Sequence, residues 1–476
     1  MNHRYRILLR SVVAAIVGTA ATLAHAQTIR VAIGTQDTTI NCATGGLLIR
    51  ELHLLDKYLP HSGKYQGVRY DVQWKDFTSG APMTNEMVAG RLDFGAMADF
   101  PGALNGAAFQ KAGKKSIFIS VLSGSIEGSG NGIVVPLDSP VRTIADLKGK
   151  TISVPFASTA HGMLLRAIKA QGWNADTDLN IITQAPEVAG SALKAGKIDA
   201  HADFVPFADL FPYRGFARKI YDGAQSHAPT FHGALVDAAY AQKYPEIVVA
   251  YLRAAIEANR LMTEDPEKYS LLIQKVAGIE APVDYLFHGP LGIQTRDFTW
   301  KPEYRRALST AIDTLKLLKK TDTTLNADSF IDDRYIREAF KQSGLDYDAA
   351  LANYAKSPLK ANDATTGKPI RGSNDVAQVW LENEAHVRDY ANPAEAFAAL
   401  DALRHGGAKV RAVFVHDHAD GLKLFANQAW YVKDERGALA AFWLRSAANA
   451  YAQRVSGKVL DYAAVSALPR QSVAAR

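Results

Sequence analysis

Apolar and polar positions follow two different periods through the first half of the chain. Several short runs are apolar at every second position, which is typical of strands, and the segments between them have apolar residues at helical spacing. The predicted strands span 28–34, 68–74, 92–97 and 117–122, and the predicted helices span 47–58 and 82–89. The β-α-β-α-β order over residues 28–101 predicts a parallel sheet with helices on both faces.

A second set of the same kind follows the first. Its strands are predicted at 151–154, 180–183 and 198–202, and its helices at 160–170 and 188–195. The phrase Gly196–Ala200 repeats the pattern of Gly90–Phe94, since each follows a helix and leads into a short strand. We interpret this repeat as two lobes of like architecture that face each other. Coincidence between two short motifs is the alternative.

Small and acidic residues follow the predicted strands, at the edge where open parallel sheets bind ligands. Ser158 and Thr159 open the helix after strand 151–154, and the free backbone N–H groups of such a first turn attract anions. A simple helix cap is the alternative for these hydroxyls. Asp99 and Asp203 each end a strand and could contact a ligand amine or cap a turn.

The second half of the chain divides near residues 355–365, where turn signals replace apolar periodicity. Before this boundary, a segment at 232–237 is predicted to cross back to the first lobe, and helices are predicted to wrap around that lobe at 245–262, 266–276, 302–319 and 333–343. After it, the pattern predicts strands at 376–380, 387–390, 410–415 and 425–431, with helices at 393–404 and 438–455. Residues 356–476 therefore form a small α+β domain in this prediction.

Composition narrows the class of protein. A chain of 476 residues with 48% hydrophobic and 21% charged residues is globular and needs two or three folded units. The net charge of +6 is spread along the chain without a Lys/Arg block, which argues against nucleic acid as a partner. Basic residues, an apolar run over 11–23 and the sequence Ala24-His25-Ala26 predict a secretory signal over 1–26. We therefore expect an exported, periplasmic protein.

Catalytic signatures are missing from the sequence, so we do not expect an enzyme. No G-x-S-x-G, H-E-x-x-H or paired-cysteine motif occurs, and Cys42 is the single cysteine. His416 and His418 would share one face of a strand and could bind copper or zinc. A solvated strand end is the interpretation we favour for them, because two ligands are too few for a tight metal site. We expect no cofactor, with copper as the alternative.

Five stretches in order resemble periplasmic solute-binding proteins of the nitrate/sulfonate/taurine class of ABC importers. They are Phe77–Pro82, Met87–Gly95, Asp146–His161, Ala192–Ala200 and Tyr244–Leu252. The resemblance implies an α/β fold of two lobes joined by a hinge, with a small-molecule ligand buried between them and delivered to a membrane permease. Lobe 1 would comprise about 27–123 and 235–355, and lobe 2 about 124–234.

The same resemblance implies which loops meet the ligand. The corresponding residues in this chain are Gln36, Ser79, Gly80, Asp99, Ser158, Thr159 and Asp203. This chain departs from the pattern with His161 after the Ser-Thr pair and His232 near the hinge, and we include both among the ligand-binding residues.

The tail is similar to NosL, a copper accessory protein of nitrous oxide reductase. The similar stretches are Gly367–Arg371, Val376–Val379, Val410–Asp417 and Gln428–Val432. The Cys and Met ligands of that family are missing, and Ala364, Thr365 and Lys368 stand beside the turn instead. The sequence therefore predicts a periplasmic substrate-binding component of an ABC importer for a small polar or anionic solute. A copper-handling protein that acts through the C-terminal domain is the alternative.

Overall fold

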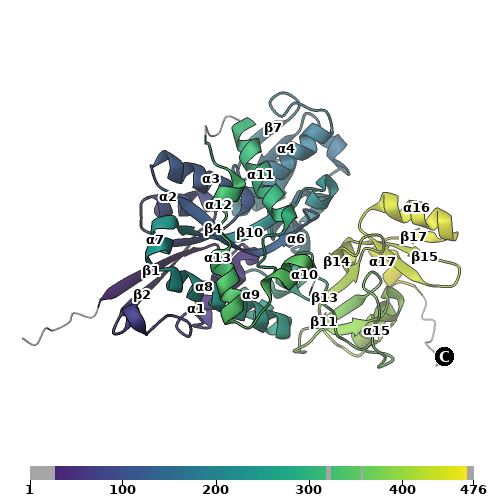
Figure 1. Cartoon of the computed structure of the whole chain (residues 1–476). Helices are drawn as coiled ribbons and strands as arrows, with labels where there is room; N and C mark the ends of the chain where they lie inside the picture. The colour runs from purple at the N-terminus through teal and green to yellow at the C-terminus, as the bar shows by residue number, and fades with distance from the viewer. Residues whose placement is uncertain (1–26, 318–322, 355–356, 469–476) are drawn as a thin grey trace, which may run out of the picture.

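The computed structural model describes residues 27–317, 323–354 and 357–468. The predicted signal at 1–26 lies outside the described residues. Within the described part of the chain, no helix has both the length and the apolar character needed to cross a membrane. Figure 1 shows two α/β lobes built from the first three quarters of the chain, with a separate module at their side.

Lobe 1 is built on a five-stranded sheet with the order β2-β1-β3-β10-β4. The strands are β1 Thr28–Thr35, β2 Arg69–Asp76, β3 Phe94–Ala98, β4 Ser116–Ser125 and β10 Thr230–Asp237. Its first helices are α1 Leu47–Glu51, α2 Gly80–Val88 and α3 Asp99–Lys111. The α1 helix is shorter than the predicted 47–58, because the chain turns at His53, which has a positive φ of 52°.

Lobe 2 is built on a second five-stranded sheet with the corresponding order β7-β6-β8-β5-β9. The strands are β5 Gly132–Pro136, β6 Thr151–Val154, β7 Asn180–Thr183, β8 Ala200–Asp203 and β9 Ala217–Asp222. The helices are α4 Thr159–Ala170, α5 Pro186–Lys194 and α6 Phe207–Tyr213. The matching strand orders confirm the prediction of two lobes of like architecture.

The parallel pairing predicted for the β-α-β units is confirmed, and each sheet also contains antiparallel pairs that the sequence did not predict. β1 pairs in parallel with β2 and β3, whereas β10 runs antiparallel to β3 and β4. In lobe 2, β5 likewise runs antiparallel to β8 and β9. The reason is connectivity: β5 and β10 are the strands by which the chain enters each sheet from the other lobe, so they arrive against the direction of the local β-α-β units.

The helices after β10 cover lobe 1. They are α7 Ala238–Lys243, α8 Pro245–Glu264, α9 Pro266–Ala277, α10 Ala281–His288, α11 Pro302–Leu317, α12 Ala327–Phe330, α13 Arg334–Gln342 and α14 Tyr347–Ala352. α8 packs on α13 and α9, α9 packs on α10, and α11 packs on α3. These helices fix α10 and α11 beside the junction between the lobes, where α10 also contacts α6.

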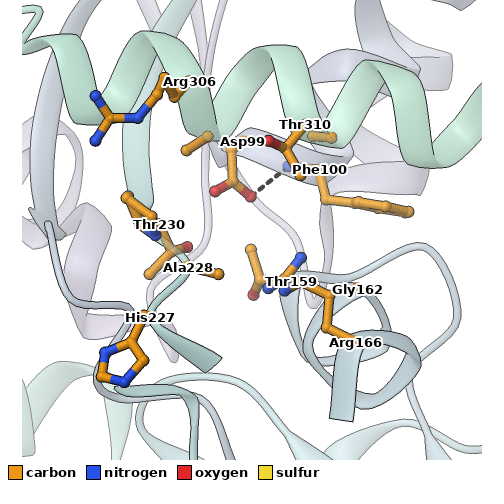
Figure 2. A pocket seen from close by; sticks show the side chains of 13 residues that line it. Asp99, Phe100, Thr159, Gly162, Arg166, His227, Ala228, Thr230, Arg306 and Thr310 are labelled. Carbon is orange, nitrogen blue, oxygen red and sulfur yellow. Dashed lines mark hydrogen bonds between the residues drawn. The ribbon is translucent and has the colours of Figure 1, made fainter. Parts of the chain in front are cut away.

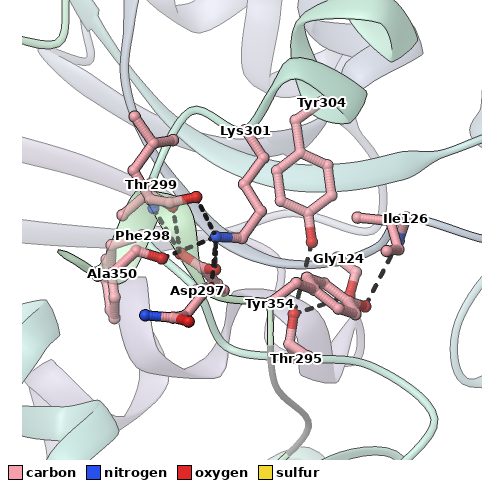
Figure 3. A network of polar contacts seen from close by, with 12 residues as sticks. Gly124, Ile126, Thr295, Asp297, Phe298, Thr299, Lys301, Tyr304, Ala350 and Tyr354 are labelled. Carbon is pink, nitrogen blue, oxygen red and sulfur yellow. Dashed lines mark hydrogen bonds and ion pairs between the residues drawn. The ribbon is translucent and has the colours of Figure 1, made fainter. Parts of the chain in front are cut away.

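A buried lysine attaches the last of these helices to the lobe (Figure 3). The Lys301 side chain is 3% exposed, and its Nζ donates to the carbonyls of Ala350, Leu351 and Asn353 at 2.8, 3.1 and 2.8 Å. Asp297 pairs with the same ammonium at 2.8 Å. Since the last carbonyls of a helix have no partner within it, Lys301 caps the end of α14 and anchors it.

The C-terminal module consists of two β-β-α-β units with similar topology. The first contains β11 Ala377–Leu381, β12 Arg388–Tyr390, α15 Pro393–His405, β13 Val410–His416 and the added strand β14 Lys423–Phe425. The second contains β15 Trp430–Lys433, β16 Leu439–Phe442, α16 Arg445–Val455, β17 Lys458–Leu460 and the short helix α17 Tyr462–Ser466. The sheet orders are β12-β11-β13-β14 and β16-β15-β17, so the first strand of each unit lies between the other two.

Two predictions for the tail were wrong. The strand predicted at 425–431 is divided, because β14 ends at Phe425 and β15 begins at Trp430 in the other sheet. The start of the helix predicted at 438–455 is the strand β16. Its sequence Leu-Ala-Ala-Phe favours a helix locally, but pairing with β15 over four residues decides in favour of a strand.

Candidate functional site

A pocket of about 240 Å³ lies between the lobes and is lined by residues from both (Figure 2). Lobe 1 contributes the start of α3 and one face of α11, lobe 2 contributes the first two turns of α4, and the chain entering β10 closes one side. The lining residues are Asp99, Phe100, Thr159, Gly162, Arg166, His227, Ala228, Pro229, Thr230, Arg306, Ala307, Thr310 and Ala311.

The sequence of α4 explains how lobe 2 presents polar groups here. Ser158 caps the helix by accepting a hydrogen bond from the His161 N–H at 3.2 Å. Thr159, Gly162 and Arg166 then follow at spacings of three and four, so they share one face of the helix. A Cβ at Gly162 would lie 3.3 Å from the Phe100 ring, so glycine lets α4 approach α3 closely.

Asp99 and Arg166 supply opposite charges to the pocket. The Asp99 carboxylate is 6% exposed and accepts hydrogen bonds from the N–H groups of Phe100 at 2.6 Å and Phe231 at 3.4 Å. Burial raises the pKa of Asp99 to about 6, although the Arg166 guanidinium acts to lower it. Burial also lowers the pKa of Arg166, and Asp99 opposes that shift. The pocket can therefore change charge between pH 5 and 7.

One buried polar atom in this pocket, Nε of Arg166, has no hydrogen-bond partner among the described residues. The Thr230 side chain, which is 4% exposed, hydrogen-bonds to Asp99. A buried donor or acceptor without a partner costs about 1–3 kcal/mol, so such groups are usually satisfied by a ligand or an ordered water. The pocket is therefore prepared for a small polar guest that accepts from a guanidinium and meets a hydroxyl.

Of the sequence-predicted site residues, Asp99 and Thr159 line this pocket and Ser158 directly precedes it. Thr159 donates to Asn131 Oδ1 at 3.0 Å, which connects α4 to the segment between the lobes. His161 lies on the neighbouring face of α4, stacked on Phe156 with ring centroids 4.7 Å apart. It also meets the edge of Phe100 from lobe 1 at 6.4 Å, so it packs where the lobes touch.

The other predicted residues lie outside the pocket lining. Ser79 precedes α2 without capping it, and a Cβ at Gly80 would lie 2.6 Å from Cβ of Pro101, so this turn packs on the start of α3. Gln36 donates to the Ala96 carbonyl at 2.9 Å inside lobe 1. The ligand contacts predicted for these three residues stay predictions.

His232 lies in β10, within the sheet of lobe 1, beside the single cysteine. Its Nδ1 is 3.4 Å from Sγ of Cys42, and burial lowers the pKa of His232 to about 3, so the imidazole is neutral at physiological pH. Burial also raises the pKa of the Cys42 thiol, so it is protonated and unreactive there. The structure gives this pair a packing role and does not bring it to the pocket.

Asp203 is fully buried and already engaged within lobe 2. Its Oδ2 lies 2.7 Å from Nε2 of His201, its Oδ1 accepts from the Phe204 N–H at 2.8 Å, and Nδ1 of His201 lies 2.7 Å from Oγ of Ser153. Ser153, His201 and Asp203 are each 0% exposed. Because the three side chains are fully buried and hydrogen-bonded to one another, we interpret them as a link between β6 and β8. Asp203 lies outside the pocket lining, and its predicted ligand contact stays a prediction.

Sequence reasoning missed Arg166, Thr230 and Arg306. The signal for Arg166 was present, since a charged residue seven positions after Thr159 falls on the same helix face. Thr230 and Arg306 reach the pocket from β10 and α11, and no local pattern connects those segments to α4. Their proximity is a product of the tertiary structure.

The metal ligands considered in the tail are engaged within the module. Nδ1 of His416 lies 2.8 Å from the Val376 carbonyl, and Nδ1 of His418 lies 2.7 Å from the Asp375 carboxylate. Within the described ranges, one group of three potential ligands has its atoms within 4.8 Å of one another, and it consists of Asp265, Glu267 and His386. The prediction of a shared strand face was wrong, because β13 ends at His416 and His418 lies beyond it. The interpretation of a solvated strand end was also wrong for His416, which is 1% exposed, and metal binding by these imidazoles stays a prediction.

Two lobes with corresponding mixed sheets, crossing segments between them and a pocket at their junction define the class of two-lobed solute-binding proteins. This chain is similar to known proteins of that class. Residues 86–269 match the NMT1/THI5-like family. The resemblance of the tail to NosL remains a prediction, and the relatives give no support to the copper-handling alternative.

Curated relatives agree with this class. A putative aliphatic sulfonates-binding protein of Escherichia coli is 28% identical over 249 residues, which are 52% of this chain and 73% of the relative. The taurine-binding periplasmic protein of the same organism is 29% identical over 199 residues, 41% of this chain and 59% of the relative. The second match thus spans little more than half of that protein.

Solved structures show the same fold. The periplasmic aliphatic sulphonate binding protein from Escherichia coli superimposes with a TM-score of 0.52 at 24% identity, covering 66% of this chain and 99% of that one. The periplasmic nitrate-binding protein from Synechocystis gives a TM-score of 0.53 at 16% identity, covering 70% and 93%. About a third of this chain lies outside each superposition.

Proposed function

We propose that this protein is the periplasmic substrate-binding component of an ABC importer for a small anionic or polar organic solute. The observation that carries this is the pocket between the lobes, in which Nε of Arg166 is buried without a partner among the described residues and the Thr230 hydroxyl lies beside Asp99. The names of the relatives, which bind aliphatic sulfonates and taurine, support an oxyanion as the recognised group.

The residues of the pocket have distinct roles in this proposal. Arg166 donates charge-assisted hydrogen bonds to the anionic group, and Thr230 supplies a hydroxyl from the opposite side. The first turn of α4 adds its positive dipole end next to Thr159. Asp99 receives an amine where the solute has one. Closure of lobe 2 onto lobe 1 buries the solute, as in other hinged binding proteins.

The location and partners follow from the same proposal. An exported protein of this class delivers its solute to an ABC permease in the inner membrane, and nucleic acid has no part in this. The relatives are named as binding proteins, so we propose binding without catalysis.

Thermal unfolding of residues 27–476 against a panel of solutes tests this. The panel comprises nitrate, taurine, alkylsulfonates, arylsulfonates, thiamine precursors, Cu(II) and Zn(II). A solute at a hundred times its dissociation constant adds about 2.7 kcal/mol to the free energy of unfolding. We expect stabilisation by at least one sulfonate or related oxyanion.

Arg166→Gln should abolish that stabilisation, because it removes the guanidinium from the pocket. Arg69→Gln is the matched control, since Arg69 is an exposed arginine on the edge strand β2 and lies far from the pocket in the sheet order. Stabilisation by metals alone, or equal stabilisation of Arg166→Gln and native protein by the same oxyanion, would contradict the proposed site.

A further inference from the structure

The C-terminal module is seated on both lobes at once through a single sheet. Figure 1 shows β13 and β14 of the module beside α10 and α6 of the lobes. β13 and β14 are antiparallel neighbours, with Phe414 paired to Phe425 and His416 paired to Lys423. Contacts made by these two strands with different lobes are therefore held at fixed separations by main-chain hydrogen bonds.

The contact with lobe 1 is centred on Tyr285 of α10, which is 1% exposed. Its ring centroid lies 5.3 Å from those of both Trp380 and Phe414, and its hydroxyl accepts a hydrogen bond from Gln378 Nε2 at 3.2 Å. Lys423 lies over the same ring at 4.1 Å and donates to the Pro290 carbonyl at 3.0 Å. This half of the interface is buried, aromatic and hydrogen-bonded.

The contact with lobe 2 is centred on Tyr213 at the end of α6. Its ring centroid lies 5.0 Å from that of Phe425, and its hydroxyl donates to the Arg411 carbonyl at 3.4 Å. Phe425 is two residues after Lys423 in β14, so the two side chains share one face of the strand. One face of one strand therefore contacts α10 through Lys423 and α6 through Phe425.

Four aromatic rings connect the two lobes without interruption. Tyr285 of lobe 1 meets Phe414 at 5.3 Å, Phe414 stacks on Phe425 at 5.4 Å, and Phe425 meets Tyr213 of lobe 2 at 5.0 Å. We propose that the module is an intramolecular clamp, which holds α6 against α10 through these rings and so favours the closed arrangement of the lobes.

The argument rests on what has to move when the lobes separate. Tyr213 belongs to lobe 2 and Tyr285 belongs to lobe 1. Separation of the lobes therefore breaks a ring contact at one end of the series. Arg214 of lobe 2 also reaches lobe 1 directly at this seam, with its guanidinium 2.7 and 3.0 Å from the two carboxylate oxygens of Glu280 and 3.3 Å from the Gly278 carbonyl. The Arg214 and Glu280 side chains are 39% and 30% exposed, so solvent weakens this contact and the aromatic contacts of the module add to it.

Distance measurement in the full chain tests the clamp without any solute. Spin labels at Lys111→Cys in α3 and Lys169→Cys in α4 report the separation of the lobes, because both positions are exposed and α3 packs on α4. The native Cys42 is 2% exposed and stays unlabelled. We expect one narrow distribution of distances between the labels in pulsed electron–electron double resonance.

Tyr213→Ala should add a longer distance, because it removes the last ring of the series. The ratio of open to closed molecules should rise by about tenfold, the size expected for one buried aromatic pair. Tyr213→Phe keeps the ring and should leave the distribution unchanged. Phe425→Leu, made on the module side, should reproduce the effect of Tyr213→Ala and covers the case in which that variant fails to fold.

Tyr462→Ala is the matched control, since Tyr462 packs on Phe397 inside the module at 5.9 Å and its ring has no contact with a lobe among the described residues. A native distribution in both Tyr213→Ala and Phe425→Leu would overturn the clamp. An equal shift in Tyr462→Ala would also overturn it, because the effect would then follow from general destabilisation. The clamp requires only that the lobes move, so its failure would leave the proposed solute binding untouched.

Discussion

Asp99 is the residue at which electrostatics and burial compete most directly in the pocket. Its carboxylate is nearly inaccessible, which disfavours the charged form, while Arg166 and two backbone N–H groups favour it. Burial prevails, since the pKa of Asp99 is raised from 3.8 to about 6. A group with a raised pKa in the folded state stabilises the protein at low pH, and this contribution is lost as pH rises through 6.

The stability of the native protein should therefore fall relative to Asp99→Asn between pH 4 and pH 7. A shift of about two units corresponds to roughly 3 kcal/mol at 1.36 kcal/mol per unit. Urea unfolding at pH 4.5 and pH 7 measures the difference, with the exposed loop variant Asp138→Asn as the control. If the free energies of unfolding of the native protein and Asp99→Asn differed by the same amount at both pH values, Asp99 would not titrate in this range.

The same residue gives solute binding a pH dependence with a defined sign. An oxyanion beside Arg166 is repelled by the charged Asp99 carboxylate, so its affinity should increase as pH falls through 6. A solute whose amine meets Asp99 should instead bind more weakly as pH falls. Calorimetric titration of a sulfonate with and without an amine at pH 5 and pH 7.5 distinguishes the two. An affinity independent of pH for both would contradict a role of Asp99 in the site.

At the scale of elements, α4 and α14 illustrate two ways of completing a helix end. The start of α4 is satisfied locally by Ser158, three residues before the N–H that it accepts from. The end of α14 is satisfied by Lys301, about fifty residues earlier in the chain. The first arrangement is visible in the sequence as a hydroxyl before an apolar pattern, whereas the second depends on packing.

Lys301→Met should destabilise the protein by about 3 kcal/mol, because it removes the buried ammonium that pairs with the half-buried Asp297 and donates to three carbonyls. Urea unfolding at pH 7 measures the loss. Lys275→Met is the control, since Lys275 is an exposed lysine in the last turn of α9. Similar stabilities for the two variants would mean that the Lys301 network is not retained in solution.

At the scale of the whole molecule, the lobes and much of the module share one connected apolar core, and a smaller separate cluster lies under α16 of the module. Buried residues from Ile29 in β1 to Val465 in α17 belong to the same cluster, and Tyr285 carries it across the junction into the module. A shared core couples the unfolding of the parts that it joins. The module is thus integrated with the lobes, although a third of the chain lies outside the superposed relatives.

Scanning calorimetry of residues 27–476 should therefore show one cooperative transition. Tyr285→Ala removes a buried aromatic side chain at the junction, a change that typically costs about 3–5 kcal/mol, and should uncouple the module so that a second, lower transition appears. Phe397→Ala, within the module, leaves the junction intact and should lower the temperature of the single transition without dividing it. Two separate transitions in the native protein would contradict the coupling.

Much of the fold was accessible from the sequence because it is encoded locally. The alternation of β1 and β2, the apolar face of α4 and the repeated Gly-x-x-Asp phrase each lie within a few residues of one another. The tail was predicted less well, because Leu439–Phe442 has helical residue preferences and becomes a strand through pairing with β15. The antiparallel strands β5 and β10 were missed as such, since strand direction depends on how the chain passes between lobes.

The sequence by itself determined the two-lobed α/β plan, the short turn of hydroxyls at α4 and the relationship to solute-binding proteins, because these depend on residues close together in the chain. The tertiary structure alone decided that Arg166, Asp99 and Thr230 line one pocket and that Asp203 is hydrogen-bonded to His201 inside lobe 2. It also decided that four rings from α10, β13, β14 and α6 meet in a row. Each of these contacts joins segments tens to hundreds of residues apart, and only the packing of complete lobes brings such segments together.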